Sequence, residues 1–214
     1  MARYTLFAAP NTYALCAHAM LEEVGADYAL RWVALFAAHP DPDFAAASPH
    51  CRTPALLGPE GPLFETGAIA LYLAERFPEA GLLIPEADPE RGPFLQWIHY
   101  LASTLQPDVI LQYHPEFYME TEADRARLRA ASMRRLEDVW AVLDKALAEG
   151  PGPWFFSRGP TVPDILLGMQ TVWDETFPKG IEAFPALARQ RAALTARPAI
   201  ARVLAAHRAA RSPA

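Results

Sequence analysis

The first part of the chain alternates short apolar runs with a segment of helical periodicity. Residues 4–7 are apolar or aromatic and predict a strand, and residues 12–24 then repeat apolar side chains at helical spacing before Gly25 ends the segment. Residues 28–33 predict a second strand. The polar, proline-interrupted stretch 37–48 favours a loop with a short helix. The order strand, helix, strand is typical of a βαβ unit.

Two further short strands and a helix follow. Proline has no N–H for a strand ladder, so Pro54 suits the start of the apolar run 55–57. Residues 58–61, Gly-Pro-Glu-Gly, are typical of a turn, and the run 62–64 supplies the second strand of a hairpin. Helical spacing resumes after Glu65. The pattern as a whole predicts the order β-α-β-α-β-β-α, with a mixed four-stranded sheet.

The remainder of the chain is helical in its period. Apolar side chains recur at helical spacing over residues 90–106, 123–148, 165–173, 184–195 and 198–210. The proline- and glycine-containing stretch before them, 78–89, predicts a linker. We therefore expect an α+β chain with a small α/β domain over 1–77, a linker over 78–89 and an all-helical domain over 90–214.

Two capping boxes mark helix starts in the second half. Thr121 stands three residues before Asp124, and Thr161 stands three residues before Asp164. In such a box the hydroxyl and the carboxylate each accept a hydrogen bond from a backbone N–H that the helix leaves unpaired. Both pairs therefore predict the first turn of a helix.

Composition narrows the class of protein. The 214 residues are 52% hydrophobic, which permits a substantial core, and the net charge of −6 argues against general nucleic-acid binding. No apolar run approaches the roughly 20 residues of a membrane span, and the N-terminal residues lack a signal-peptide core. Two cysteines, Cys16 and Cys51, make no disulfide framework. We expect a cytoplasmic protein without nucleic-acid or membrane partners.

Glu65 and Thr66 occupy the predicted start of the third helix. We expect Thr66 to be its N-cap, with the unpaired N–H groups and positive dipole end of the helix beside it. Such an end attracts a carboxylate, and the side chain of Glu65 can bind an ammonium group. A site that offers both suits the α-amino acid end of a small molecule. An ordinary strand, turn and capped helix is the alternative interpretation.

The string Arg52-Thr53-Pro54, followed by Glu65-Thr66 and its helix, resembles the glutathione transferases. In that family a cis proline follows the residue whose backbone pairs with the cysteinyl part of glutathione, and a Glu-Ser or Glu-Thr pair holds the γ-glutamyl end. The resemblance implies these roles for Thr53, Pro54, Glu65 and Thr66. It covers nearly every residue, and it implies a thioredoxin-like N-terminal domain, an all-α C-terminal domain and a homodimer.

The bacterial beta class is the most similar class of the family. Residues 13–18, Tyr-Ala-Leu-Cys-Ala-His, resemble that class's Cys-Ser-Leu-x-x-His string, and residues 96–100 resemble its first helical segment. Tyr13 stands at the position of the class's cysteine. The box that begins at Thr161 resembles the family's C-terminal folding box, although Pro163 replaces the usual alanine.

Three residues are candidates for activating the thiol of glutathione. A free thiol has a pKa near ~8.5, and a hydrogen-bond donor at a helix N-terminus lowers it. Tyr13 has a phenolic donor and the beta-class position, whereas alignment on the serine-type classes selects Asn11 or Thr12. We favour Tyr13. The alternative roles are aromatic packing for Tyr13 and helix capping for Asn11 and Thr12.

The family resemblance also suggests which residues contact the glycyl end of glutathione and which contact the electrophile. Arg52 and His39 are our candidates for the glycyl carboxylate of glutathione, with solvated loop residues as the alternative. We expect the electrophile on the helical side, near an aromatic cluster that suits flat apolar molecules or is simply core. The expected lining is Tyr100, Gln106, Tyr113, His114, Phe117 and Tyr118.

These observations lead to a functional expectation. We expect a detoxifying glutathione S-transferase that conjugates the glutathione thiolate to small electrophiles, with glutathione as co-substrate and no metal. One alternative is a glutathione-dependent disulfide reductase or peroxidase, and another is a non-enzymatic transferase-like binding module. The absence of a cysteine at position 13 weakens protein-thiol redox chemistry, and the intact Glu65-Thr66 pair argues against a pure module.

Overall fold

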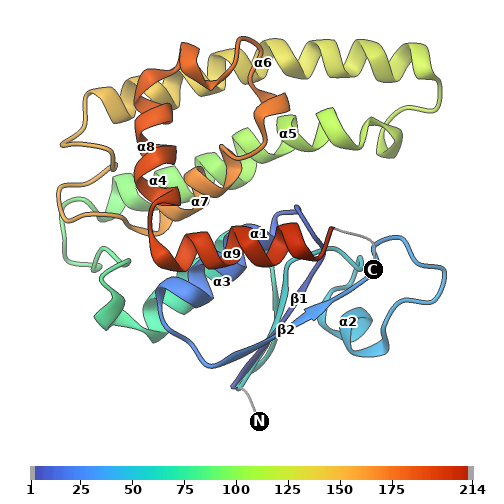
Figure 1. Ribbon diagram of the computed structural model, residues 1–214, viewed down its shortest axis with the longest axis horizontal. Coiled ribbons are helices and arrows are strands. Elements are labelled where there is room, and N and C mark those ends of the chain that lie inside the picture. Colours follow the sequence, from blue (N-terminus) through green and yellow to red (C-terminus); the bar gives the residue numbers. More distant parts are fainter. Residues whose placement is uncertain (1–2, 212–214) are drawn as a thin grey trace. The chain divides into compact units, whose positions relative to one another are not determined.

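The computed structural model describes residues 3–211, which form two compact units coloured by sequence in Figure 1. One unit combines residues 3–83 with residues 194–211, and the other spans residues 84–193. The helical period of the sequence placed the last helix, α9 (Pro198–Ala209), in the predicted all-helical domain. Its contacts in the structure group it with the first unit instead. Both ends of the described chain therefore contribute to the first unit.

The first unit contains a four-stranded mixed sheet, as predicted. Its strands are β1 (Tyr4–Ala8), β2 (Tyr28–Trp32), β3 (Ala55–Gly58) and β4 (Gly61–Phe64), in the order β2-β1-β3-β4. β1 and β2 are parallel, while β3 is antiparallel to both β1 and β4. The tight β3–β4 hairpin uses the turn that the Gly-Pro-Glu-Gly sequence predicted.

Helices cover both faces of this sheet. They are α1 (Ala14–Glu23), α2 (Pro42–Ala47), α3 (Thr66–Arg76) and α9, with a short 3₁₀ turn, η1 (Pro78–Ala80), after α3. Successive strand residues point to opposite faces. Phe7 accordingly packs with Phe44 of α2, whereas α1, α3 and α9 lie on the other side of the sheet (Figure 1).

The second unit begins with a helix that is longer than its sequence pattern predicted. α4 (Arg91–Tyr100) continues through a π-helical turn, η2 (Leu101–Leu105), into α5 (Gln106–Tyr113). The predicted end at Gln106 is therefore wrong. Pro107 lacks an N–H and crowds the preceding turn of an α-helix, and a wider π turn directly before it accommodates the ring.

The rest of the chain up to α9 is also helical. It contains η3 (Pro115–Phe117), α6 (Glu122–Ala148), α7 (Val162–Gln170), η4 (Asp174–Thr176), η5 (Ile181–Ala183) and α8 (Pro185–Thr195). Every residue of α7 is buried, so this helix forms the core of the unit. α6 packs along α5.

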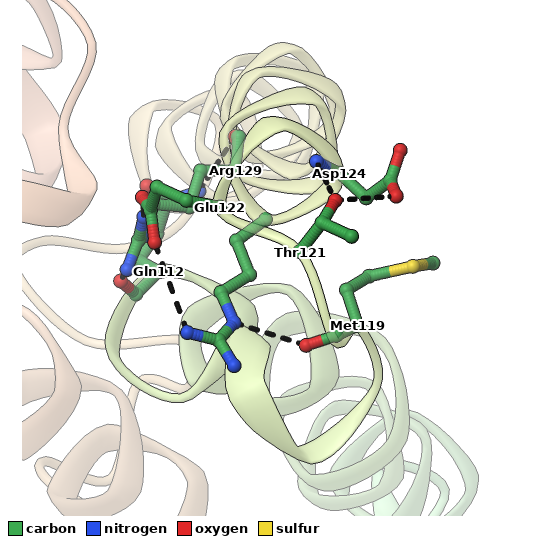
Figure 2. Close-up of polar contacts among 7 residues, drawn as sticks. Gln112, Met119, Thr121, Glu122, Asp124 and Arg129 are labelled. Carbon is green, nitrogen blue, oxygen red and sulfur yellow. Dashed lines mark hydrogen bonds and ion pairs between the residues drawn. The ribbon is translucent and has the colours of Figure 1, made fainter.

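Polar contacts fix the corner between α5 and α6 (Figure 2). Thr121 caps α6 as predicted: its hydroxyl accepts from the Asp124 N–H at 3.2 Å and donates to the Asp124 carboxylate at 2.7 Å. The side-chain amide of Gln112 donates to the carbonyl oxygen of Arg129 at 2.9 Å, which joins the two helices. Thr121 is exposed and Gln112 and Asp124 are half-buried, so water competes for each hydrogen bond and its net contribution to stability is modest.

The second capping box is buried. The Asp164 carboxylate accepts from the Thr161 N–H at 2.8 Å, the Thr161 hydroxyl at 2.8 Å and the Phe155 N–H at 2.9 Å. Burial raises the pKa of Asp164 to about 6, against the opposing effect of these hydrogen bonds. The box therefore satisfies two buried backbone donors as well as starting α7.

The two boxes give a matched test of this difference. We expect Asp164→Ala to lower the free energy of unfolding by about 3 kcal/mol, because it leaves buried N–H groups unpaired, and Asp124→Ala to lower it by only about 0.5–1 kcal/mol. Urea unfolding followed by circular dichroism measures both values. Equal losses would contradict the buried role of the Asp164 carboxylate.

Candidate functional site

Three chain segments enter or leave the sheet at the same edge, where β1 and β4 end and β3 begins. The strand register places Phe7 beside Ala55, and Ala55 beside Phe64. The loop after β1, the turn before β3 and the start of α3 after β4 must therefore lie close together. These segments carry the sequence-predicted residues 11–13, 53–54 and 65–66.

A direct contact joins the first two segments. The Thr12 and Thr53 hydroxyl oxygens are 3.0 Å apart, and the Thr12 hydroxyl also donates to the Ala9 carbonyl oxygen at 2.8 Å. Since the Thr12 proton goes to Ala9, the Thr53 hydroxyl is the donor between the two threonines. The Thr12 oxygen also accepts from the Ala14 N–H at 3.3 Å. Thr12 therefore ties the start of α1 to the Thr53 segment.

Unusual backbone conformations gather at this edge. Among the described residues, the non-glycine positions with positive φ are Asn11 (56°), Phe36 (60°), Cys51 (49°) and Glu65 (75°). All but Phe36 lie in, or two residues before, the three segments. The left-handed region is uncommon for such residues, and conformations of this kind are enriched at binding and catalytic sites.

The Thr53-Pro54 peptide bond is cis, as the family resemblance implied. The turn before it is held by Ser48, whose buried hydroxyl accepts from the Arg52 N–H at 2.9 Å and donates to the Arg52 carbonyl oxygen at 2.9 Å. The Arg52 backbone is thus fixed while its side chain is exposed. His39 is also exposed, in the loop between β2 and α2.

The start of α3 differs from the prediction. Thr66 is the first residue of the helix and its side chain is buried, so the predicted N-cap role of Thr66 is wrong. Glu65 occupies the N-cap position instead, without a side-chain cap, because its positive φ turns the chain directly from β4 into the helix. The Glu65 side chain is exposed beside the first N–H groups of α3, which lack acceptors within a helix.

The two cysteines differ in environment. Cys16 lies in the first turn of α1 and is completely buried, which raises its thiol pKa to about 12 against a weaker opposing backbone hydrogen bond. Its thiol is therefore unreactive near neutral pH. Cys51 is partly buried against the cluster that contains Phe7 and Phe44. Tyr13, the favoured thiol donor, is partly buried directly before α1.

Sequence reasoning missed one residue at the site. The Asn11 N–H donates to Nδ1 of His207 on α9 at 3.2 Å. Burial lowers the pKa of His207 to about 3, and the neighbouring His18 adds to this effect. Burial also lowers the pKa of His18 to about 4, although Glu22 opposes it. Both imidazoles are therefore neutral near pH 7.

The residues predicted for the electrophile all belong to the second unit. They are Tyr100, Gln106, Tyr113, His114, Phe117 and Tyr118. Tyr100 and Gln106 are partly buried, and burial raises the pKa of Tyr100. Tyr113 is exposed and donates to Glu175 at 3.0 Å, while the exposed Phe117 ring stacks on His114 with centroids 4.9 Å apart.

Metal-binding clusters and membrane-spanning helices are both absent from the part of the chain that the structure describes. Residues 3–211 hold no group of three or more His, Cys, Asp or Glu side chains arranged to bind a metal ion. No helix within the same residues is long and apolar enough to cross a membrane.

Comparison with known proteins identifies the family. The family model described as "Glutathione S-transferase, N-terminal domain" matches residues 2–75. The model described as "Glutathione S-transferase, C-terminal domain" matches residues 107–207. The chain belongs to the glutathione S-transferase family. Its mixed sheet, its helical second unit and these matches confirm the predicted thioredoxin-like and all-helical arrangement.

Individual relatives are similar over almost the whole chain. Glutathione S-transferase GstA of Escherichia coli O157:H7 is 27% identical over 198 residues, which cover 91% of this chain and 94% of that protein. A sphingomonad glutathione S-transferase solved with glutathione is 28% identical, with a TM-score of 0.83 and coverage of 95% and 98%. A beta class enzyme of Sphingomonas chungbukensis has the same fold, with 24% identity, the same coverage and a TM-score of 0.83.

The buried histidines predict a pH dependence of stability. Below about 6.5 the unfolded chain takes up protons that the folded protein accepts only near pH 4 at His18 and near pH 3 at His207. The contribution of the two neutral histidines to stability is thus complete above about pH 6.5, and it is lost as the pH falls from there toward their pKa values in the folded protein. Urea unfolding measures the free energy of unfolding at each pH. Between about pH 4 and pH 6.5, this free energy should depend on pH less steeply in His207→Phe, by about 1.4 kcal/mol per pH unit. Parallel curves for the two proteins would contradict the neutral, buried state of His207.

Proposed function

We propose that this protein is a glutathione transferase that conjugates the glutathione thiolate to small electrophilic molecules. The observation that carries the proposal is the strand register, which brings the Thr53-Pro54 turn to the same end of the sheet as the Glu65-Thr66 helix start. Family membership supports the proposal further, as does the similarity to the sphingomonad enzyme, whose structure was solved in complex with glutathione.

Each end of glutathione has a matching group at this edge. We assign the cysteinyl backbone to Thr53, which precedes the cis proline and can pair with an extended peptide. The α-carboxylate of the γ-glutamyl end suits the N–H groups at the start of α3, and its ammonium suits the exposed Glu65 carboxylate. Arg52 and His39 remain our candidates for the glycyl carboxylate.

Tyr13 is our candidate for the thiol donor. The Thr12 hydroxyl proton already points to the Ala9 carbonyl oxygen, which weakens Thr12 as a donor to sulfur. The Asn11 backbone N–H points to His207, which leaves the Asn11 side-chain amide as the remaining alternative. A phenol beside the N-terminus of α1 would donate to the thiolate and so stabilise it.

The chemistry then requires no covalent enzyme intermediate. Glutathione loses its thiol proton to solvent, and the thiolate sulfur forms a bond to the electrophilic carbon. Any group displaced at that carbon leaves with its bonding electron pair, and the site contributes by holding the thiolate in position. We propose that Tyr100, Gln106, Tyr113 and Phe117 contact the electrophile, and that the protein works as a cytoplasmic homodimer.

The reductase alternative is limited by the cysteines. Cys16 is fully buried and its pKa is raised to about 12, so the thiolate that redox exchange needs is scarce near neutral pH. A reductase or peroxidase activity would therefore not use Cys16, and its thiol would come from the half-buried Cys51 or from bound glutathione itself. We place conjugation first for this reason, and we expect assays of conjugation and of disulfide reduction to separate the two activities.

Glutathione binding tests the assignment of Glu65 directly. Isothermal titration calorimetry should detect binding to the wild type, and Glu65→Ala should weaken it at least about 10-fold because the ligand ammonium loses its partner. Glu60→Ala is the matched control, since Glu60 lies in the turn at the other end of the same hairpin and bonds to Tyr72 and Arg76. Equal weakening by both variants would contradict the assignment of Glu65.

Thiol ionisation tests the donor. We expect Tyr13→Phe to raise the pKa of bound glutathione by about one unit, a change of roughly 1.4 kcal/mol, while leaving binding nearly unchanged. Ultraviolet absorbance of the thiolate, followed against pH, measures this value. Asn11→Ala is the comparison variant for the remaining donor. An unchanged pKa in Tyr13→Phe, with a raised one in Asn11→Ala, would transfer the role to Asn11.

A further inference from the structure

We infer that His207 on α9 is a positioning residue for the Asn11–Tyr13 loop, and that a chain of hydrogen bonds through His18, Tyr28 and Glu22 fixes the tautomer that this role needs. The inference extends the proposed function, because the loop it concerns holds the candidate thiol donors. It starts from the 3.2 Å hydrogen bond that the Asn11 N–H donates to Nδ1 of His207.

The far end of the chain determines the tautomer of His18. The Tyr28 hydroxyl donates its proton to the Glu22 carboxylate at 2.6 Å. The Tyr28 oxygen also lies 2.7 Å from Nε2 of His18, and since its proton is already used, Nε2 of His18 must be the donor. Neutral His18 therefore carries its proton on Nε2, and its Nδ1 is an acceptor.

The near end determines the tautomer of His207 in the same way. Its Nδ1 accepts from the Asn11 N–H, so the proton of the neutral ring is on Nε2. Within residues 3–211, buried Nε2 of His207 and buried Nδ1 of His18 both lack a hydrogen-bond partner. One is a donor and the other an acceptor, and they belong to neighbouring rings with centroids 5.4 Å apart.

These complementary groups would complete a one-directional chain if Nε2 of His207 donates to Nδ1 of His18, directly or through a water, so that each buried nitrogen gains a partner. Every hydrogen bond would then run in one sense, from Asn11 through His207, His18 and Tyr28 to Glu22. With the opposite tautomer, His207 would present an N–H to the N–H of Asn11 and would repel it.

The helix that carries His207 is well anchored to α1. Arg197 donates to both carboxylate oxygens of the buried Glu23, at 2.8 and 2.6 Å. Arg202 donates to Glu22 at 2.8 Å, which also holds the carboxylate at the end of the chain. His207 is only 3% exposed, and its ring lies edge-on to Trp32 at 4.9 Å between centroids. His207 therefore has little freedom to follow the loop, and the loop must follow His207.

The position of Asn11 gives this contact its consequence. Asn11 has a φ of 56°, and Tyr13 follows two residues later at the start of α1. A hydrogen bond to its N–H stabilises this uncommon conformation, which in turn sets the direction in which the chain enters Tyr13. Loss of the acceptor should loosen the loop and misplace the thiol donor without unfolding the protein.

Variants at both ends of the chain test the inference. His207→Phe keeps the ring but removes the acceptor, whereas His207→Asn restores an acceptor oxygen close to the position of Nδ1. Tyr28→Phe breaks the chain at β2. Arg197→Lys is the control: it changes another contact of α9 but keeps a cation for Glu23, so the helix stays attached and the chain is left intact.

Nitrogen-15 NMR of the protein without glutathione is the first measurement. The wild type should show His207 protonated on Nε2 and not on Nδ1, and the Asn11 amide signal should shift in His207→Phe and in Tyr28→Phe but not in Arg197→Lys. Protonation of Nδ1 in the wild type, or an Asn11 signal that is unchanged in His207→Phe, would overturn the inference. This result does not depend on whether glutathione binds.

The pKa of bound glutathione is the second measurement. It should rise in His207→Phe, with an accompanying loss of about 3- to 10-fold in kcat/KM, and recover in His207→Asn. An unchanged pKa in His207→Phe would overturn the positioning role even where the NMR contact is present. Failure of the wild type to bind glutathione would instead contradict the proposed function, and the NMR result would decide the inference alone.

Discussion

The hydrogen-bonded register of β1, β3 and β4 is the constraint on which the site depends. It brings Phe7, Ala55 and Phe64 into one row, and so delivers three separate loops to one edge of the sheet. A shift of one residue would move each strand's apolar side chains to the wrong face, and burial of Phe7 against α2 opposes such a shift. The core packing on both sides of the sheet therefore also maintains the geometry of the proposed glutathione site.

Much of this arrangement could be predicted from local sequence. Apolar alternation, the Gly-Pro-Glu-Gly turn and the boxes at Thr121 and Thr161 determine strands and helices through neighbours only a few residues away. Thr53-Pro54 and Glu65-Thr66 could be proposed as glutathione-binding residues because they stand in a recognisable string. Their grouping at one edge then follows from the hairpin and from the pairing of β3 with β1.

The features that escaped prediction depend on conformation or on distant contacts. Thr66 looks like an N-cap in sequence, but the positive φ of Glu65 moves the cap by one residue. Pro107 looks like a helix end, but the π turn before it lets the helix continue. His207 lies 196 residues from Asn11, and a histidine in the last turn of a helix is usually explained by the helix dipole. Only the fold shows that it contacts the site.

The most direct test of the account is to map glutathione onto the folded chain by NMR. Addition of glutathione to isotope-labelled protein should shift the amide signals of Asn11–Tyr13, of Thr53 and of Glu65–Gly67 together, with one shared dissociation constant. Such a result would establish that the three segments form one site. Shifts confined to other parts of the chain, or no shifts at millimolar glutathione, would contradict the account.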